Sequence, residues 1–254
     1  MTDAHVLSAL GFDVTRTEGG RRGIAEILPE MHAPGTKAVR TSILATWVDV
    51  VAGHLALDRI VPKVPVTLSL DVHVADPWRE CRAVQADTTV VKSGSSVVVV
   101  RVDIVDEQRR PVAVGSATMM ASPVPGLVFD PELAHKDAPH DPTARLTMPY
   151  TEHVSCVREG RGVASVPLAP NAVNASHTLQ GGLIGLVAEE AALSLFDEGE
   201  VAVSSMMLRY LRPVRVGPAV GTAVRIGSFC DAMVRDRGQD DRVALTAALG
   251  VAVR

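Results

Sequence analysis

One segment of the chain joins a glycine pair to a pair of acids inside an otherwise apolar helix. It covers residues 174–190 (NASHTLQGGLIGLVAEE), where a polar loop leads into Gly181 and Gly182. Residues 39–54 (VRTSILATWVDVVAGH) follow the same plan, and Asp49 stands there 140 residues before Glu189. A plan that recurs at this distance predicts two copies of one structural unit.

The elements around these segments also recur in the same order. The first copy is expected to have a hairpin, a deeply buried helix and four strands, at residues 11–28, 41–57, 64–74, 82–92, 96–105 and 111–120. The second copy is expected to have a hairpin, a helix, one strand and two or three further strands, at residues 152–168, 182–196, 201–211 and 219–254. The second hairpin is expected to turn at Glu159-Gly160, and Pro77 and Pro213 end equivalent strands. Thr41 or Ser42 is expected to cap the first helix.

A segment rich in Pro, Asp and His separates the two copies. Residues 123–147 have no clear hydrophobic period, which is typical of a linker. The predicted units are therefore residues 1–122 and residues 148–254.

The composition excludes several classes of protein. Hydrophobic residues make up 47% of the 254 residues and charged residues 21%, which favours a compact globular protein. A net charge of −4 and only four Phe, two Tyr and two Trp argue against nucleic acid as a partner. No apolar run is long enough to cross a membrane, and the first residues do not read as a secretory signal. Three cysteines without metal-like spacing predict buried thiols in the cytoplasm and no metal site.

The second copy resembles a known family. Its loop and helix read Asn174-Ala-Ser-His177-Thr-Leu-Gln180-Gly181-Gly182 and then Glu189. This is similar to the motif Asn-x-x-Gly-x-x-His-Gly-Gly, followed seven residues later by an acid, of the phenylacetate-pathway type of acyl-CoA thioesterase. The strand read as SSMMLRYLRPV is also similar. The resemblance covers nearly the whole chain and implies an α+β fold, a tandem (double) hotdog with two long buried helices, each wrapped by an antiparallel β-sheet.

The chain departs from the family motif at several positions. His177 stands where the family has Gly, and Gln180 replaces the His before the glycine pair. In the first copy Pro34 occupies the Asn position, and residues 40–42 (Arg-Thr-Ser) replace His-Gly-Gly. The acid, Asp49, is the part of the motif that the first copy keeps.

Thioester hydrolysis needs hydrogen-bond donors for the carbonyl and a carboxylate that activates water or attacks directly. The free N–H groups at a helix start suit the first task, and glycine lets a substrate approach the backbone closely. Gly181 and Gly182 are therefore the predicted oxyanion site, and the side-chain amides of Asn174 and Gln180 are further candidate donors.

The acid that serves this site is expected to come from the other copy. Glu189 lies seven residues beyond Gly182, about 10 Å along the helix at 1.5 Å per residue, too far to act at its own helix start. An antiparallel partner helix would bring Asp49 there instead. Family members share sites between two units in this way, often with a Ser or Thr on the next strand, and Thr67 or Ser69 fits that position.

The reciprocal site would place Glu189, with Ser204 or Ser205, against the degenerate loop around Arg40. Lacking glycines, this second site could be weak, inactive or used for binding, and Arg40 could hold an anionic group there.

Structural roles compete with these assignments. Asp49 and Glu189 could be buried acids bound to the backbone, and the glycines could serve close helix packing. His177 is interpreted as a loop residue rather than a base, and with Ser69, Ser205 and Arg40 it is a candidate for substrate binding. Glu190 is interpreted as a solvated or interfacial residue.

The resulting hypothesis is an acyl-CoA thioesterase that needs no cofactor beyond the coenzyme A of its substrate. Two alternatives stay open: a non-catalytic acyl-CoA-binding protein with the same fold, and, more weakly, an enoyl-CoA hydratase or dehydratase. Two such chains are expected to pair as a homodimer of double hotdogs.

Overall fold

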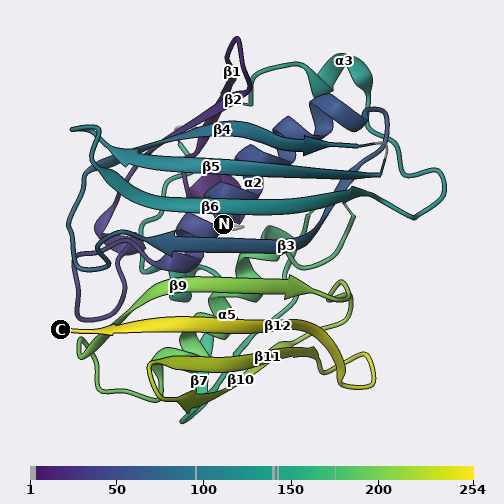
Figure 1. Cartoon of the computed structure of the whole chain (residues 1–254). Coiled ribbons are helices and arrows are strands. Elements are labelled where there is room, and N and C mark those ends of the chain that lie inside the picture. Colours follow the sequence, from purple (N-terminus) through teal and green to yellow (C-terminus); the bar gives the residue numbers. More distant parts are fainter. Residues whose placement is uncertain (1–3, 95, 139–140, 142, 175) are drawn as a thin grey trace.

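The computed structural model describes residues 4–94, 96–138, 141, 143–174 and 176–254, and its two halves have the same order of elements (Figure 1). The first half consists of α1 (Val6–Ala9), β1 (Asp13–Arg16), β2 (Arg21–Glu26), the 3-10 helix η1 (Pro29–Met31), α2 (Thr41–Ile60), β3 (Pro65–Val74), β4 (Ala83–Ser93), β5 (Val97–Asp106) and β6 (Pro111–Ala121). The second half consists of α4 (Tyr150–His153), β7 (Val157–Gly160), β8 (Val163–Val166), the 3-10 helix η2 (Pro170–Ala172), α5 (Gly181–Leu193), β9 (Val201–Tyr210), β10 (Ala219–Ile226), β11 (Phe229–Asp236) and β12 (Arg242–Val253). Even the short helices recur, so the repeat read from the sequence extends to details that its pattern did not predict.

Within the described ranges, twelve strands form one continuous antiparallel sheet. Its order is β1-β2-β4-β5-β6-β3-β9-β12-β11-β10-β8-β7, so the second half mirrors the first. The halves meet where β3 pairs with β9, and Asp71 lies opposite Met207 in that pair. These two residues are 136 positions apart, as Pro77 and Pro213 are. A pseudo-twofold axis therefore passes between them.

The two long helices lie side by side on one face of this sheet (Figure 1). Most residues of α2 and nearly all residues of α5 are buried, because each helix packs against its own half of the sheet and against the other helix. Such helices are apolar around most of their circumference, which is the pattern from which they were predicted. This packing brings the start of each helix beside the middle of its partner.

The start of α2 corrects one prediction. The cap residue is Arg40, and its side chain makes no capping hydrogen bond, so Thr41 and Ser42 are the first two helical residues. The Ser42 N–H group instead donates to Glu189 Oε1 at 3.2 Å. The prediction of a local cap was wrong because the other half of the molecule supplies the capping group.

The ends of other elements also differ from the prediction. Helix α2 continues to Ile60, because Asp58 in its last turn pairs with the fully buried guanidinium of Arg21 at 2.8 Å. Helix α5 begins one residue earlier than expected and ends at Leu193, where the Ser194 hydroxyl donates to a carbonyl of the last turn. The second hairpin turns at residues 161–162 rather than at Glu159-Gly160, because residues 150–153 form α4.

The segment expected to be a linker contains the short helix α3 (Pro131–Ala134). Arg21 donates to the backbone oxygens of Ala134 and Lys136, which fixes this segment to the end of α2. The boundaries at residues 122 and 147 stay a prediction.

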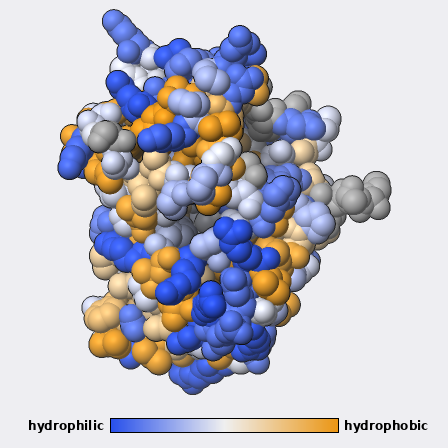
Figure 2. All heavy atoms as spheres, turned by 90° about the vertical axis from the view of Figure 1, so that its right-hand side faces the viewer, coloured by the Kyte–Doolittle hydropathy of each residue, from blue (hydrophilic) through white to orange (hydrophobic). Residues whose placement is uncertain are grey.

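The distribution of side chains on the surface and the burial of the cysteines are those expected of a globular protein. Polar and apolar side chains are intermixed on the face shown in Figure 2. The three cysteines are free and buried, as predicted. No helix in the described part of the chain is both long and apolar enough to cross a membrane.

Candidate active site

Asp49 lies in the middle of α2 and turns toward the start of α5. Its side chain is half-buried, and Oδ1 accepts a hydrogen bond from Thr67 Oγ1 on β3 at 2.6 Å. Burial raises the pKa of Asp49 from 3.8 to about 6, although the Thr67 hydrogen bond acts in the opposite direction. A carboxylate with this pKa can take up a proton near neutral pH, which suits a general base.

A β-bulge sets the direction of Thr67. The register of β3 against β6 shifts between Thr67 and Ser69, so Leu68 is an extra residue. Because a bulge reverses the alternation of side chains, Thr67 points to the same side of the sheet as the buried Leu70. Ser69 lies on the opposite side, and no hydrogen bond joins it to Asp49 in the described structure. Of the two predicted partners, the structure brings only Thr67 to the acid.

Gly181 is the group of α5 that Asp49 faces. A Cβ atom built on Gly181 would lie 3.4 Å from Asp49 Oδ2 and 3.5 Å from the hydroxyl of Tyr210. The Gly181 N–H group makes no hydrogen bond to any described residue, as expected for the first residue of a helix. A residue with a free backbone N–H group in one half and a carboxylate in the other half are therefore direct neighbours.

Gln180 changes the predicted set of donors. It is the cap residue of α5, and its Oε1 accepts hydrogen bonds from the N–H groups of Gly182 at 2.5 Å and Leu183 at 3.3 Å. The prediction of a free Gly182 amide is therefore wrong. The Nε2 group of Gln180 has no acceptor among the described residues, so Gln180 can still donate a hydrogen bond through it.

Gly182 has a packing role instead. A Cβ atom at this position would overlap the side chain of Thr46 on α2. Glycine is required because the two helices approach closely there, and the structural alternative considered for the glycine pair holds for Gly182. Gly181 has room for a methyl group.

The side chain of Asn174 is committed to its own loop. Its Oδ1 accepts hydrogen bonds from Ser176 N–H and Thr178 N–H, and its Nδ2 donates to Thr178 Oγ1 at 2.9 Å. Asn174 therefore shapes the loop before α5. Its Nδ2 group keeps a second hydrogen, so the role of this amide as a donor to a carbonyl stays a prediction. His177 is exposed in this loop and has a φ of 55°, a left-handed conformation that glycine adopts most easily. That conformation explains a glycine at this position in the similar motif.

The reciprocal site around Glu189 is filled by protein groups. Glu189 is only 1% exposed, and it accepts hydrogen bonds from the N–H group and, at 2.6 Å, from the hydroxyl of Ser42. Arg40 Nη1 lies 3.4 Å from Glu189 and 2.5 Å from Glu190. The acid thus occupies the helix start at which a substrate carbonyl would bind. The anionic groups that Arg40 holds are these two glutamates.

Glu190 completes this ion-pair network. It is 4% exposed, so the prediction of a solvated residue is wrong and that of an interfacial residue is right. Its second carboxylate oxygen lies 2.7 Å from Arg158 Nε on β7. Burial alone would raise the pKa of Glu190, but the charges of Arg40 and Arg158 outweigh it and hold that pKa below its ordinary value. Ser205 takes no part, because it lies opposite the exposed His73 in the central strand pair, on the face of the sheet away from the buried Met206.

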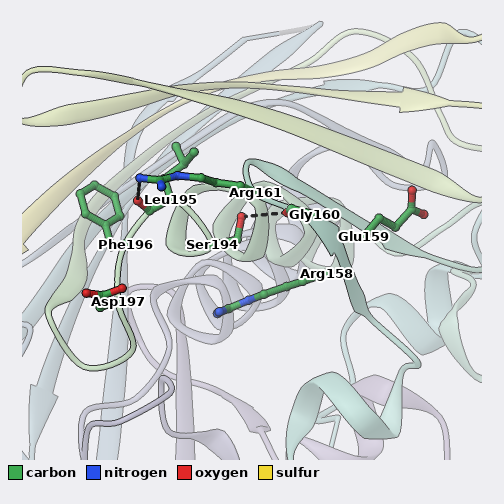
Figure 3. A pocket seen from close by; sticks show the side chains of 8 residues that line it. All are labelled: Arg158, Glu159, Gly160, Arg161, Ser194, Leu195, Phe196 and Asp197. Atoms are coloured by element: carbon green, nitrogen blue, oxygen red, sulfur yellow. Dashed lines mark hydrogen bonds between the residues drawn. The ribbon is translucent and has the colours of Figure 1, made fainter.

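A surface pocket lies beside this network rather than at Asp49. Figure 3 shows it between residues 158–161 and residues 194–197, at the C-terminal end of α5. Arg161 and Ser194 are bound to backbone oxygens at its rim. Arg158 belongs both to the pocket and to the ion pair with Glu190, so the pocket adjoins the filled site.

Comparison with known proteins agrees with this architecture. Residues 41–113 match the Thioesterase superfamily. A comparison with curated proteins gives no match. Among solved structures, the 12:0-ACP thioesterase from Umbellularia californica has a TM-score of 0.62 and 10% identity, covering 92% of this chain and 97% of that one.

Two further structures match over almost their whole length. The tesB protein of Mycobacterium avium subspecies paratuberculosis has a TM-score of 0.61 and 14% identity, covering 98% of each chain. A protein with a hotdog fold from Alicyclobacillus acidocaldarius has a TM-score of 0.58 and 11% identity, covering 98% of this chain and 97% of that one.

These matches confirm the predicted fold class, an α+β tandem hotdog. The superfamily match also bears out the expected class of enzyme, a thioester hydrolase. The narrower resemblance, to the phenylacetate-pathway type, stays a prediction.

The two glycines should respond differently to the same substitution. Gly182→Ala places a methyl group on Thr46 and should lower the free energy of unfolding by about 1–3 kcal/mol. Gly181→Ala should leave stability unchanged or slightly raised, since alanine favours a helix over glycine by about 1 kcal/mol. Urea unfolding followed by circular dichroism measures both. Equal losses in the two variants would contradict the assignment of Gly182 to packing and Gly181 to the site.

Proposed function

We propose that this protein hydrolyses acyl-CoA thioesters at one composite site, formed by Asp49 and Thr67 of the first half and by Gln180 and Gly181 of the second. The observation that carries the proposal is the position of Asp49, whose carboxylate lies in van der Waals range of the Cβ position of Gly181. A half-buried acid beside a free helix-start amide supplies the two groups that the reaction needs.

In the proposed reaction the thioester carbonyl oxygen accepts hydrogen bonds from Gly181 N–H and Gln180 Nε2. Asp49 takes a proton from a water molecule whose oxygen attacks the carbonyl carbon. The carbon–sulfur bond then breaks, and the proton passes to the thiolate, which gives a carboxylic acid and free coenzyme A. Direct attack by Asp49 uses the same placement of groups. Neither route requires a metal or a redox cofactor.

The acid at the second helix start is proposed to have a structural role only. Glu189 already accepts the hydrogen bonds that a carbonyl would accept there. Arg40 and Arg158 neutralise the charges of Glu189 and Glu190. Removing a partner from a buried charge pair is costly, so this network stays closed when substrate is present. One active site per chain follows.

The choice of coenzyme A rests on the resemblance of residues 174–189 to the phenylacetate-pathway type of thioesterase. One structural neighbour is a thioesterase for a 12:0-ACP, so acyl carrier protein is the competing carrier. The three buried thiols favour a reducing compartment such as the cytoplasm. A homodimer stays part of the proposal.

Asp49→Asn should strongly reduce turnover while keeping the fold. Asparagine preserves the size of the side chain and can still accept the Thr67 hydrogen bond, but it cannot act as a base or nucleophile. Free thiol release from short, medium, long and aromatic acyl-CoAs should fall about 10²–10⁴-fold. Asp87→Asn, in a partly exposed ion pair on β4, is the matched control and should keep wild-type rates.

The same panel separates the alternatives. Unchanged turnover in Asp49→Asn would contradict the composite site. If the wild type releases no thiol from any acyl-CoA, but an acyl-CoA raises its melting temperature, the protein is a binding protein. Preference for acyl carrier protein substrates would identify that protein, rather than coenzyme A, as the carrier. A change in absorbance of an enoyl-CoA would indicate a hydratase.

The pH dependence of kcat/KM should report the ionisation of Asp49. The active form is the carboxylate, and burial raises its pKa to about 6, so kcat/KM should rise tenfold per pH unit below that value and level off above it. Thr67→Val removes a hydrogen bond that stabilises the charged form, so the midpoint should move to higher pH. A profile flat between pH 5 and 8, or a midpoint that moves down in Thr67→Val, would contradict the role of Asp49.

A further inference from the structure

The composite site holds fewer free backbone donors than a glycine pair suggests. Gly182 N–H is bound to Gln180 Oε1, and the amide of Asn174 is bound within its loop. Gly181 N–H and Gln180 Nε2 are the donors of this site that have no acceptor among the described residues, and Asn174 Nδ2 uses one of its two hydrogens in the loop. A developing oxyanion is stabilised by donors that already point at it, so a third donor at this place would act on the reaction directly.

Tyr210, the last residue of β9, is such a donor. Its hydroxyl donates to the Gly181 carbonyl oxygen at 3.1 Å. The hydroxyl and the ring atom Cε1 each lie 3.5 Å from the Cβ position of Gly181, and Asp49 Oδ2 lies 3.4 Å from the same position. The phenol and the carboxylate therefore border the same point, the Cβ position of Gly181, whose N–H group is free of described partners.

The hydrogen bond from Tyr210 can be exchanged at low cost. The carbonyl oxygen of a residue in the first turn of a helix already accepts the N–H group four residues later, so it stays satisfied without the phenol. Burial, followed by the charge of Asp49, raises the pKa of Tyr210 well above its ordinary value. The hydroxyl thus keeps its proton and can only donate to a carboxylate or carbonyl.

The repeat provides an internal comparison. At the 136-residue offset between Pro77 and Pro213, the equivalent of Tyr210 is Val74. The half whose helix start is filled by Glu189 thus has an aliphatic side chain at this strand position. The half whose helix start has a free amide has a hydroxyl.

We propose that the Tyr210 hydroxyl leaves the Gly181 carbonyl when substrate binds and donates its hydrogen bond to the thioester carbonyl oxygen, as the third donor of the oxyanion site. This inference rests on the proposed thioesterase function and adds a catalytic residue to it. No bond other than hydrogen bonds is made or broken by Tyr210.

Tyr210→Phe tests the proposal, because it removes the hydroxyl and keeps the ring. Loss of one oxyanion donor should lower kcat about 10²-fold with little change in KM. Tyr150→Phe is the matched control. Tyr150 is the other tyrosine of the chain, and its buried hydroxyl has no hydrogen-bond partner among the described residues. That variant should keep the wild-type kcat.

A spectroscopic readout separates donation to substrate from support of Gly181. A non-hydrolysable ketone analogue of an acyl-CoA, with a CH₂ group in place of sulfur and a ¹³C-labelled carbonyl, is bound to each protein. The carbonyl stretching frequency should rise in Tyr210→Phe and stay unchanged in Tyr150→Phe. An unchanged frequency in Tyr210→Phe, or a kcat within twofold of wild type, would overturn the proposal.

The role of Tyr210 and the thioesterase activity can be overturned separately. A wild type that is active, an inactive Asp49→Asn and a fully active Tyr210→Phe would overturn the role of Tyr210 alone. A wild type without turnover on any acyl thioester would overturn the proposed function and this inference together.

Discussion

The close contact between α2 and α5 at Thr46 and Gly182 determines where every group of the candidate site lies. With a side chain at position 182 the two helices could not approach as they do. Because they run past each other at this distance, the acid in the middle of each helix reaches the start of the other. The pairing of β3 with β9 joins the two halves of the sheet and so fixes the same relative position of the two helices.

The same packing of helices therefore produces two different sites, one proposed to take the substrate and one filled by protein groups. At the start of α5 a free amide meets a half-buried acid whose pKa burial raises to about 6, which leaves the acid available for chemistry. At the start of α2 the acid, Glu189, accepts hydrogen bonds from Ser42 and is neutralised by Arg40. Burial raises the pKa of both acids, but Glu189 has Ser42 and Arg40 of the other half as partners, whereas Asp49 has no ion-pair partner among the described residues. Sites that retain such unfavourable charges are often the functional ones.

The sequence predicted the parts of this account that depend on periodicity and spacing. The repeat, the two buried helices and the exchange of acids between halves follow from patterns and from the rise of a helix. The direction of Thr67 depends on a bulge, which an alternating pattern does not reveal. The capping of Gly182 by Gln180 and of Ser42 by Glu189 depends on side-chain rotamers and tertiary contacts. Tyr210 was not recognised as a site residue, because an aromatic residue at the end of a strand is typical of packing.

The central claim is that each chain has a single composite site, and the number of ligands bound tests it most directly. Isothermal titration with the non-hydrolysable ketone analogue of an acyl-CoA that the enzyme hydrolyses gives this number for the intact protein. The account predicts one molecule per chain, and weaker binding in Gly181→Ala, whose methyl group would enter the site. Two molecules per chain, or one molecule bound with unchanged affinity in Gly181→Ala, would contradict it.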